Sequence, residues 1–268
     1  MRHTFLRTSA LVASLVIAGQ APGAQAVDHG AYDRLLRAHV TNGFVDYDAF
    51  TADPAFAGYL RLLASTDPAA LPRPEQLAFW INAYNAYTIQ LINLKGERES
   101  IRNINKSLGL LRLKGPWSEA FAVVGGRTYT LDDIEQRTIR PTFREPRIHF
   151  ALVCAAVGCP PLRSEAYTGA RLEAQLEDQA RTFLTRTPAK NRVDVPNRTV
   201  HHSQVFTFSN YLDDFGGSKA AMGRFIARYY PAGAEKALLE SGEFTAVKTA
   251  YDWSLNSVAN GRRLGLVR

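Results

Sequence analysis

The stretch Phe79–Asn93, FWINAYNAYTIQLIN, decides how this chain folds. It carries no charged side chain, yet it holds three asparagines. Apolar residues recur at three- and four-residue spacing, and Phe79 lies off the main stripe, so more than one side of the predicted helix is apolar. Such a helix belongs inside a protein or a membrane, and the amides argue against the membrane. We therefore expect a central buried helix, opened by Pro72 and Pro74.

The amides of this helix need partners, because an unsatisfied buried amide costs about 1–3 kcal/mol. At 100° per residue, Asn82 and Asn85 share one flank. Two roles remain open for them. They can pin the backbone of neighbouring strands, or one amide can hold His149 or offer a donor to a substrate carbonyl.

Short helices and hairpins alternate around this helix without a regular βαβ rhythm, which favours the α+β class. We expect one domain, with the central buried helix packed on a small antiparallel sheet and with peripheral helices. Hairpins are predicted to turn at Gly125–Gly126 and at Pro196–Asn197. The apolar run Arg147–Val153, RIHFALV, is predicted to be a buried strand, and Phe244–Tyr251 a further strand.

The first 26 residues are typical of an export signal. Arg2 and Arg7 form a basic start, Ala10–Gly19 is an apolar run, and Ala24–Ala26 is a small-x-small cleavage site. The run is too short to span a membrane, although a retained amino-terminal anchor is the alternative. We expect residues 1–26 to be removed, and residues 27–268 to form a periplasmic or secreted domain without a membrane span.

Composition and charge narrow the classes of protein. Apolar residues make up 46% of the 268 positions, so the chain is not of the disordered class. The formal charge is +7, and removal of the leader lowers it by two. Because Lys and Arg are scattered rather than clustered, we expect no nucleic-acid partner. The expected partner is a small-molecule or peptide substrate, or another protein.

The densest cluster of chemically active residues runs from Arg147 to Cys154 and continues to Cys159. An imidazole at His149 could take the proton of a Cys154 thiol, whose thiolate would attack an acyl carbon. On a regular strand, residues five apart point to opposite faces, so this pairing needs a bend. A Cys154–Cys159 disulfide, or a buried thiol beside a core histidine, is the alternative.

Other polar residues give weaker signals. His201 and His202 are adjacent and would face opposite ways on a strand, so they are not expected to share a metal, and His39 stands alone. Asp252 lies between two aromatic residues and could orient an imidazole. Asp213–Asp214 is expected on a solvated surface. The sequence predicts no metal and no cofactor, since two cysteines without CxxC pairs do not make a zinc site.

Four motifs together resemble the bacterial family known as domain of unknown function 547. They are FWINAYNAYTIQLIN, LDDIE, RIHFALVCAAVGCPPLRSEAYTG and YDWSLN, and the likeness covers roughly Pro72–Asn256. The order of elements is also similar to that of the transglutaminase and papain-like thiol enzymes. That likeness implies a nucleophile on the central helix and a histidine on a following strand. This sequence has no cysteine on its central helix.

Two functions follow as hypotheses. The first is an exported thiol hydrolase or acyl transferase acting on a peptide, amide or ester. Its catalytic residues would be Cys154 as nucleophile and His149 as base, with Asn82 or Asn85 polarising the carbonyl and Asp252 as orienter. The second is a non-catalytic periplasmic binding or interaction module with a Cys154–Cys159 disulfide.

Overall fold

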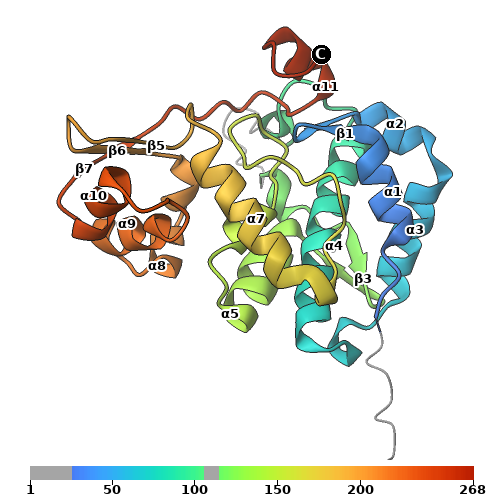
Figure 1. The fold of residues 1–268 in the computed structure, drawn as a ribbon. Coiled ribbons are helices and arrows are strands. Elements are labelled where there is room, and N and C mark those ends of the chain that lie inside the picture. The colour runs from blue at the N-terminus through green and yellow to red at the C-terminus, as the bar shows by residue number, and fades with distance from the viewer. Residues whose placement is uncertain (1–25, 106–114) are drawn as a thin grey trace, which may run out of the picture.

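Helix α4 (Arg73–Leu94) runs through the centre of the computed structural model, which describes residues 26–105 and 115–268 (Figure 1). Every residue from Leu77 to Ile89 is buried. Pro72 precedes the first turn and Pro74 lies within it, where a proline costs no helical hydrogen bond. The expected central buried helix is confirmed.

The fold is α+β, as expected, and the strands in the described part of the chain form three small sheets. In the described residues, the α-helices besides α4 are α1 (Gly30–His39), α2 (Tyr47–Ala52), α3 (Pro54–Ser65), α5 (Arg140–Phe143), α6 (Ile148–Ala151), α7 (Leu172–Thr185), α8 (Tyr211–Asp214), α9 (Lys219–Ala227), α10 (Ala234–Ser241) and α11 (Val258–Arg263), and Asp133–Ile139 is a π-helix. The strands are β1 (Val40–Thr41), β2 (Phe44–Val45), β3 (Ala122–Val124), β4 (Arg127–Tyr129), β5 (Arg192–Asp194), β6 (Thr199–His202) and β7 (Thr245–Lys248).

Both expected hairpins are present. Strands β3 and β4 pair antiparallel across Gly125–Gly126, whose positive φ angles of 54° and 74° suit glycine. Strands β5 and β6 pair antiparallel, and β7 adds to β6 in parallel. The β3–β4 hairpin is fixed to the central helix because the Tyr87 hydroxyl donates to the carbonyl of Val123.

The structure corrects one predicted element. Residues 147–153 contain the single-turn helix α6 and not a strand. A short apolar run cannot be assigned to helix or strand from periodicity alone. Tertiary packing decides here, because Ile148 and Ala151 belong to the core around α4, whereas Phe150 belongs to a second core.

The two apolar cores divide the described chain. The first surrounds α4 and includes α1, α2 and α3. The second lies between α7, β6, α9 and α10. In Figure 1, α1–α4 lie at one side and α8–α10 with β5–β7 at the other, and α7 runs between them. Helix α6 packs on α7 and contributes side chains to both cores.

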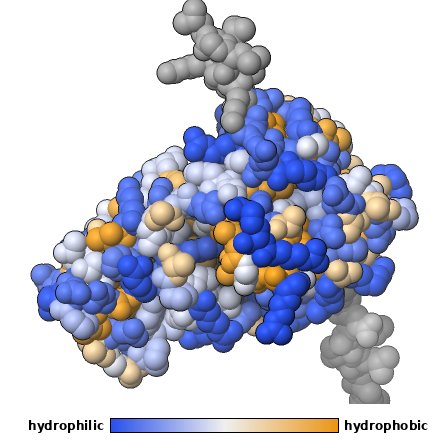
Figure 2. All heavy atoms as spheres, turned by 90° about the horizontal axis from the view of Figure 1, so that it is seen from above, coloured by the Kyte–Doolittle hydropathy of each residue, from blue (hydrophilic) through white to orange (hydrophobic). Residues whose placement is uncertain are grey.

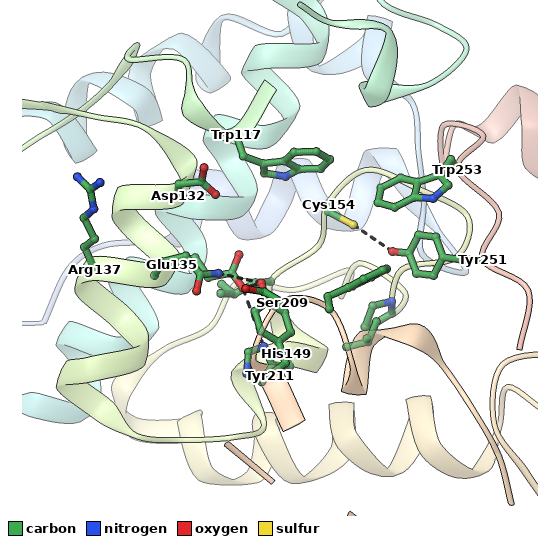
Figure 3. A pocket seen from close by; sticks show the side chains of 15 residues that line it. Trp117, Asp132, Glu135, Arg137, His149, Cys154, Ser209, Tyr211, Tyr251 and Trp253 are labelled. Carbon is green, nitrogen blue, oxygen red and sulfur yellow. Dashed lines mark hydrogen bonds and ion pairs between the residues drawn. The ribbon is translucent and has the colours of Figure 1, made fainter. Parts of the chain in front are cut away.

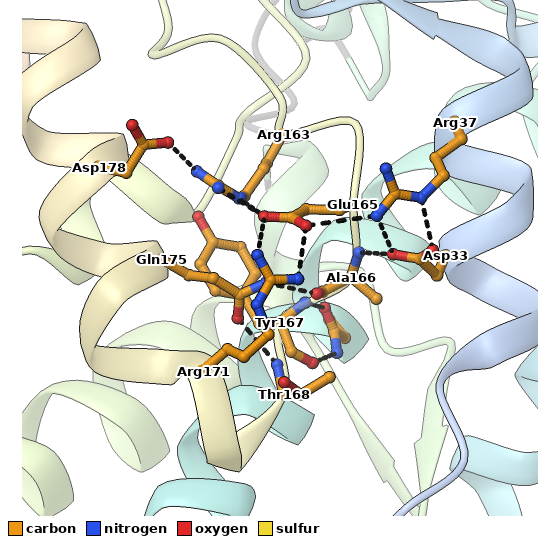
Figure 4. Close-up of polar contacts among 11 residues, drawn as sticks. Asp33, Arg37, Arg163, Glu165, Ala166, Tyr167, Thr168, Arg171, Gln175 and Asp178 are labelled. Carbon is orange, nitrogen blue, oxygen red and sulfur yellow. Dashed lines mark hydrogen bonds and ion pairs between the residues drawn. The ribbon is translucent and has the colours of Figure 1, made fainter.

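A polar network holds the loop 163–171 over the amino half of α4 (Figure 4). Glu165 accepts hydrogen bonds from Arg37, Arg163 and Arg171 at 2.7–3.3 Å. The Gln175 amide donates to the Ala166 carbonyl at 2.8 Å. The loop therefore has a fixed path, although its only regular element is the 3-10 turn Gly169–Arg171.

The face drawn in Figure 2 is mostly hydrophilic. Figure 2 shows one face, on which blue hydrophilic residues surround a central group of orange apolar ones. Among the residues that the structure describes, the exposed large apolar side chains are Leu94, Val247, Leu264 and Leu266. Within the described residues, we find no helix with both the length and the apolar character needed to cross a bilayer.

Candidate functional site

A cleft of about 470 Å³ opens between the two cores (Figure 3). Tyr251, Trp253 and Cys154 lie on one side, and Asp132 and Glu135 on the other. The floor and the remaining wall include the side chains of Trp117, His149, Phe208 and Tyr211. The cleft therefore combines aromatic faces with carboxylates and an imidazole, the composition of a small-ligand site.

Helix α6 places His149 at the base of the cleft. Its imidazole is fully buried and stacks on the Tyr211 ring, with the ring centroids 4.0 Å apart. The His149 Nε2 donates to Asp214 Oδ2 at 2.6 Å, and Arg140 holds the same oxygen at 2.7 Å. Partial burial opposes ionisation of Asp214, but the bonds from His149 and Arg140 hold the pKa of its carboxyl at about 2.

Glu135 lies beside this imidazole. It is only 8% exposed, and the Tyr211 hydroxyl donates to its Oε1. Burial raises the pKa of the Glu135 carboxyl, and the nearby His149 opposes that rise. His149 Nδ1 lies 3.9 Å from Glu135 Oε1 and has no hydrogen-bond partner among the described residues. An unpartnered nitrogen in so buried a ring is uncommon.

Cys154 and Cys159 form a disulfide on the wall of the cleft. The Tyr251 hydroxyl lies 3.2 Å from each sulfur. Burial raises the pKa of Tyr251, so its hydroxyl stays protonated and can donate to sulfur. Ala155, between the cysteines, adopts a left-handed backbone with φ of 59°, a costly conformation for a non-glycine residue.

Only some of the predicted site residues meet in this cleft. His149 and Cys154 both line it, but no hydrogen bond joins them among the described residues. Asn82 and Asn85 do not line it, and both ends of each amide bind backbone groups. The amide donors that were expected to polarise a substrate carbonyl are therefore already bonded to backbone carbonyls. The alternative role, pinning the backbone, is the one observed.

The acid that orients His149 differs from the predicted one. Asp252 instead accepts from the Ser254 amide at 2.8 Å. Asp214 lies near the surface, as expected for the Asp213–Asp214 pair, yet it also bonds His149. Chain order hides this pairing, because α8 follows α6 by about sixty residues and reaches it only through the second core.

Glu135 was not predicted as a site residue from the sequence, although the sequence contains a signal for its burial. It follows Leu131 by four residues, so a helix places both on one face. Leu131 is fully buried, and Glu135, in the π-helical segment Asp133–Ile139, is buried as well. Such a carboxylate needs a local reason, which in this fold is Tyr211 and His149.

The histidines with weaker signals do not assemble a metal site. The described residues contain no group of three or more His, Cys, Asp or Glu side chains arranged to hold a metal ion. His202 Nδ1 bonds the Ser203 carbonyl at 3.0 Å, and the His39 ring packs edge-on against Phe50.

The fold and the cleft define an α+β protein with a buried histidine–carboxylate cluster beside a disulfide. Residues 68–184 match the model of the family described as "Protein of unknown function, DUF547". The matched range holds α4, Glu135, His149 and both cysteines, whereas Tyr211, Asp214 and Tyr251 lie beyond it. No curated protein and no solved structure matches the chain.

Proposed function

We propose that the protein is an exported binding module, and that its cleft holds an ammonium-bearing small molecule or peptide end. The disulfide carries this proposal. With Cys154 bonded to Cys159, no thiolate faces the cleft to attack an acyl group. A pair of cysteines joined in this way also suits the oxidising compartment that the leader of residues 1–26 predicts.

The charges and aromatic faces of the cleft support a cationic ligand. Asp132 and Glu135 provide carboxylates, and the aromatic rings opposite them attract cations through their faces. Arg137 is the one Lys or Arg side chain among the residues that line the cleft, and it is 82% exposed and paired with Asp133. A ligand ammonium would therefore enter a site with an excess of negative charge, although the whole chain is positive.

Tryptophan fluorescence tests this binding. Trp117 and Trp253 line the cleft, whereas Trp80 is buried in α4 and serves as a constant background. Titration with amino-acid methyl esters should change the emission, and neutral sugars of similar size should not. Asp132→Asn should weaken the response about tenfold or more, as expected for loss of a charged contact. Glu240→Gln, an exposed change on α10, is the control.

Two results of the titration would contradict the proposal. Equal responses to sugars and esters would remove the cationic ligand from the proposal. No response to either class, with Trp117→Phe and Trp253→Phe as checks on the signal, would remove the binding function. Intact mass with and without reductant tests the disulfide itself, since reduction adds about 2 Da, the mass of two hydrogen atoms.

A thiol-dependent hydrolase or acyl transferase is the second candidate, favoured because His149 and Cys154 share one cleft. It requires a dithiol to reduce the bridge. The Cys154 thiolate would then attack the acyl carbon, His149 would protonate the leaving amine or alcohol, and water would release the acid. His149 would have to move toward Cys154, where the Tyr251 hydroxyl now lies.

This candidate has a separate test. After reduction, a thiol alkylator should modify Cys154 faster than Cys159, because Cys154 is half-buried at the cleft and Cys159 is buried. Hydrolysis of an activated ester should require reduction and should be lost in Cys154→Ser. Activity that persists in Cys154→Ser would exclude the thiol mechanism.

A further inference from the structure

We propose that cleavage between Ala26 and Val27 creates a new amino terminus, whose ammonium docks on the buried carboxylate of Glu75. The site lies at the start of α4, away from the cleft, and the proposal is independent of the ligand. It assigns a role to a buried carboxylate that the cleft does not use.

The chain just before α1 is already held at this point. The backbone N–H of Val27 donates to Glu75 Oε1 at 3.2 Å. Val27 is half-buried and packs against the first core, whereas Ala26 is exposed. A peptidase could therefore reach the bond before Val27, and the residue after the cut would keep its position.

Glu75 has few partners for a buried charge. It is 7% exposed, and its Oε2 accepts from the Gly169 amide at 2.6 Å. A Cβ at Gly169 would clash with that oxygen, so the loop approaches as closely as a backbone can. Neither contact supplies a positive charge.

The neighbouring imidazole does not supply the charge either. His29 Nε2 lies 3.5 Å from Glu75 Oε1, and His29 Nδ1 bonds the Tyr59 hydroxyl at 2.8 Å. Burial lowers the pKa of His29, which keeps the ring neutral at neutral pH. Among residues 26–105 and 115–268, no Lys or Arg forms an ion pair with Glu75. A buried carboxylate without a cation is costly.

Cleavage supplies the missing cation. Hydrolysis breaks the bond between the Ala26 carbonyl carbon and the Val27 nitrogen, and water gives its hydroxyl to the carbon and a proton to the nitrogen. The free α-amine is largely protonated at neutral pH. One neutral N–H donor then becomes an ammonium with three donors, and hydrogen bonds between charged groups are the stronger kind.

The consequence reaches the centre of the fold. Glu75 starts the same helix whose Asn82 and Asn85 hold the loops around Tyr167 and Val153. Docking of the new terminus would fasten this end of α4 to α1 and to the Gly169 loop. The processed chain should therefore be more stable than a chain that keeps any residue before Val27.

The first test reads the product of export. Protein recovered from the exported fraction of a host that processes leaders should begin at Val27 by intact mass and terminal sequencing. A product that begins at any other residue, or that keeps its leader, would overturn the proposal.

The second test is a four-way stability cycle on chains that begin at Val27 or at Ala26, each with Glu75 unmutated or with Glu75→Gln. In the unmutated background, the extra Ala26 should raise the unfolding equilibrium constant about tenfold or more. In the Glu75→Gln background, the extra residue should change it little. Asp28→Asn, which alters an exposed neighbouring carboxylate, should keep the full effect of Ala26. An equal effect of Ala26 in both Glu75 backgrounds would contradict the docking.

Amine labelling covers the case in which Glu75→Gln does not fold. In the unmutated Val27 chain, an amine-selective acylating reagent should modify the terminus much more slowly than in the Ala26 chain. Equal labelling rates would show a free terminus and overturn the proposal. Neither readout depends on the ligand of the cleft, so its failure and that of the binding function are distinguishable.

Discussion

Asn85 binds the backbone on both sides of the turn that follows His149 and reaches Val153. Its Nδ2 donates to the Ala151 carbonyl and its Oδ1 accepts from the Val153 amide, both at 2.9 Å. Asn82 does the same to the two backbone groups of Tyr167. These amides substitute for a neighbouring strand, so loops without a sheet can lie against a helix and still satisfy their polar groups.

Loss of one of these amides should be strongly destabilising. We expect Asn85→Ala to lower the free energy of unfolding by about 2–5 kcal/mol, because it leaves a buried N–H and a buried carbonyl unpaired. Asn93→Ala is the matched control, since its half-buried amide donates to the Tyr47 carbonyl and accepts from the exposed Arg98 side chain, so its loss leaves only one backbone group unpaired. Urea denaturation measures both, and equal losses would contradict the role assigned to Asn85.

The ion pair of Asp214 should affect how the free energy of unfolding depends on pH under acidic conditions. Its pKa of about 2 lies below the unfolded value of about 3.9. The pair therefore stabilises the native state above about pH 4, and this contribution is lost as the pH falls toward 2. The difference in unfolding free energy between the unmutated protein and Asp214→Asn should shrink over that range.

Asp213→Asn is the control for that measurement, because Asp213 is exposed and forms no ion pair among the described residues. The difference in unfolding free energy between this variant and the unmutated protein should vary by no more than about 0.5 kcal/mol between pH 5 and pH 2, the usual range for a surface change. If the two variants behave alike, the Asp214–His149 contact does not contribute in solution.

Lys190 should act in the opposite direction at alkaline pH. Burial lowers the pKa of its ammonium to about 8, below the unfolded value of about 10.4. The buried charge destabilises the native state below pH 8, and this cost disappears as the pH rises toward 10.4. The stability of the unmutated protein relative to Lys190→Met should therefore increase between pH 8 and pH 10.

The comparison with Lys190→Met is needed because tyrosines of the unfolded chain ionise near pH 10, and this affects both proteins equally. For Lys248→Met, at an exposed position of β7, the stability difference from the unmutated protein should not change with pH. If the stability difference between the unmutated protein and Lys190→Met is also independent of pH, the Lys190 ammonium, which donates to the Cys159 carbonyl, is hydrated in solution.

The sequence predicted the elements whose signals are local. The apolar helix, the Gly125–Gly126 turn and the start of α3, capped by Asp53 with Pro54 behind it, all depend on residues close in the chain. It also indicated His149 and the two cysteines as candidate site residues, because they cluster in one segment.

The rest of the site depends on contacts that no local pattern contains. Asp214 meets His149 across 65 residues, and Tyr251 meets Cys154 across 97. Helix α6 was predicted as a strand because its three apolar residues divide between two cores, and neither period can be read from so short a segment. Tertiary packing decides both features.

The disulfide offers a last prediction. A bridge across a sequence separation of 5 closes a short loop, and the chain-entropy relation gives about 2 kcal/mol of stabilisation. Cys154→Ala with Cys159→Ala, and reduction of the unmutated protein, should each lower the unfolding free energy by about this amount. Tyr251→Phe should cost less, because it removes only the hydroxyl beside the sulfurs. Thermal unfolding with and without a dithiol measures all three, and an equal effect of the dithiol on the double-alanine variant, which has no bridge, would refute the assignment.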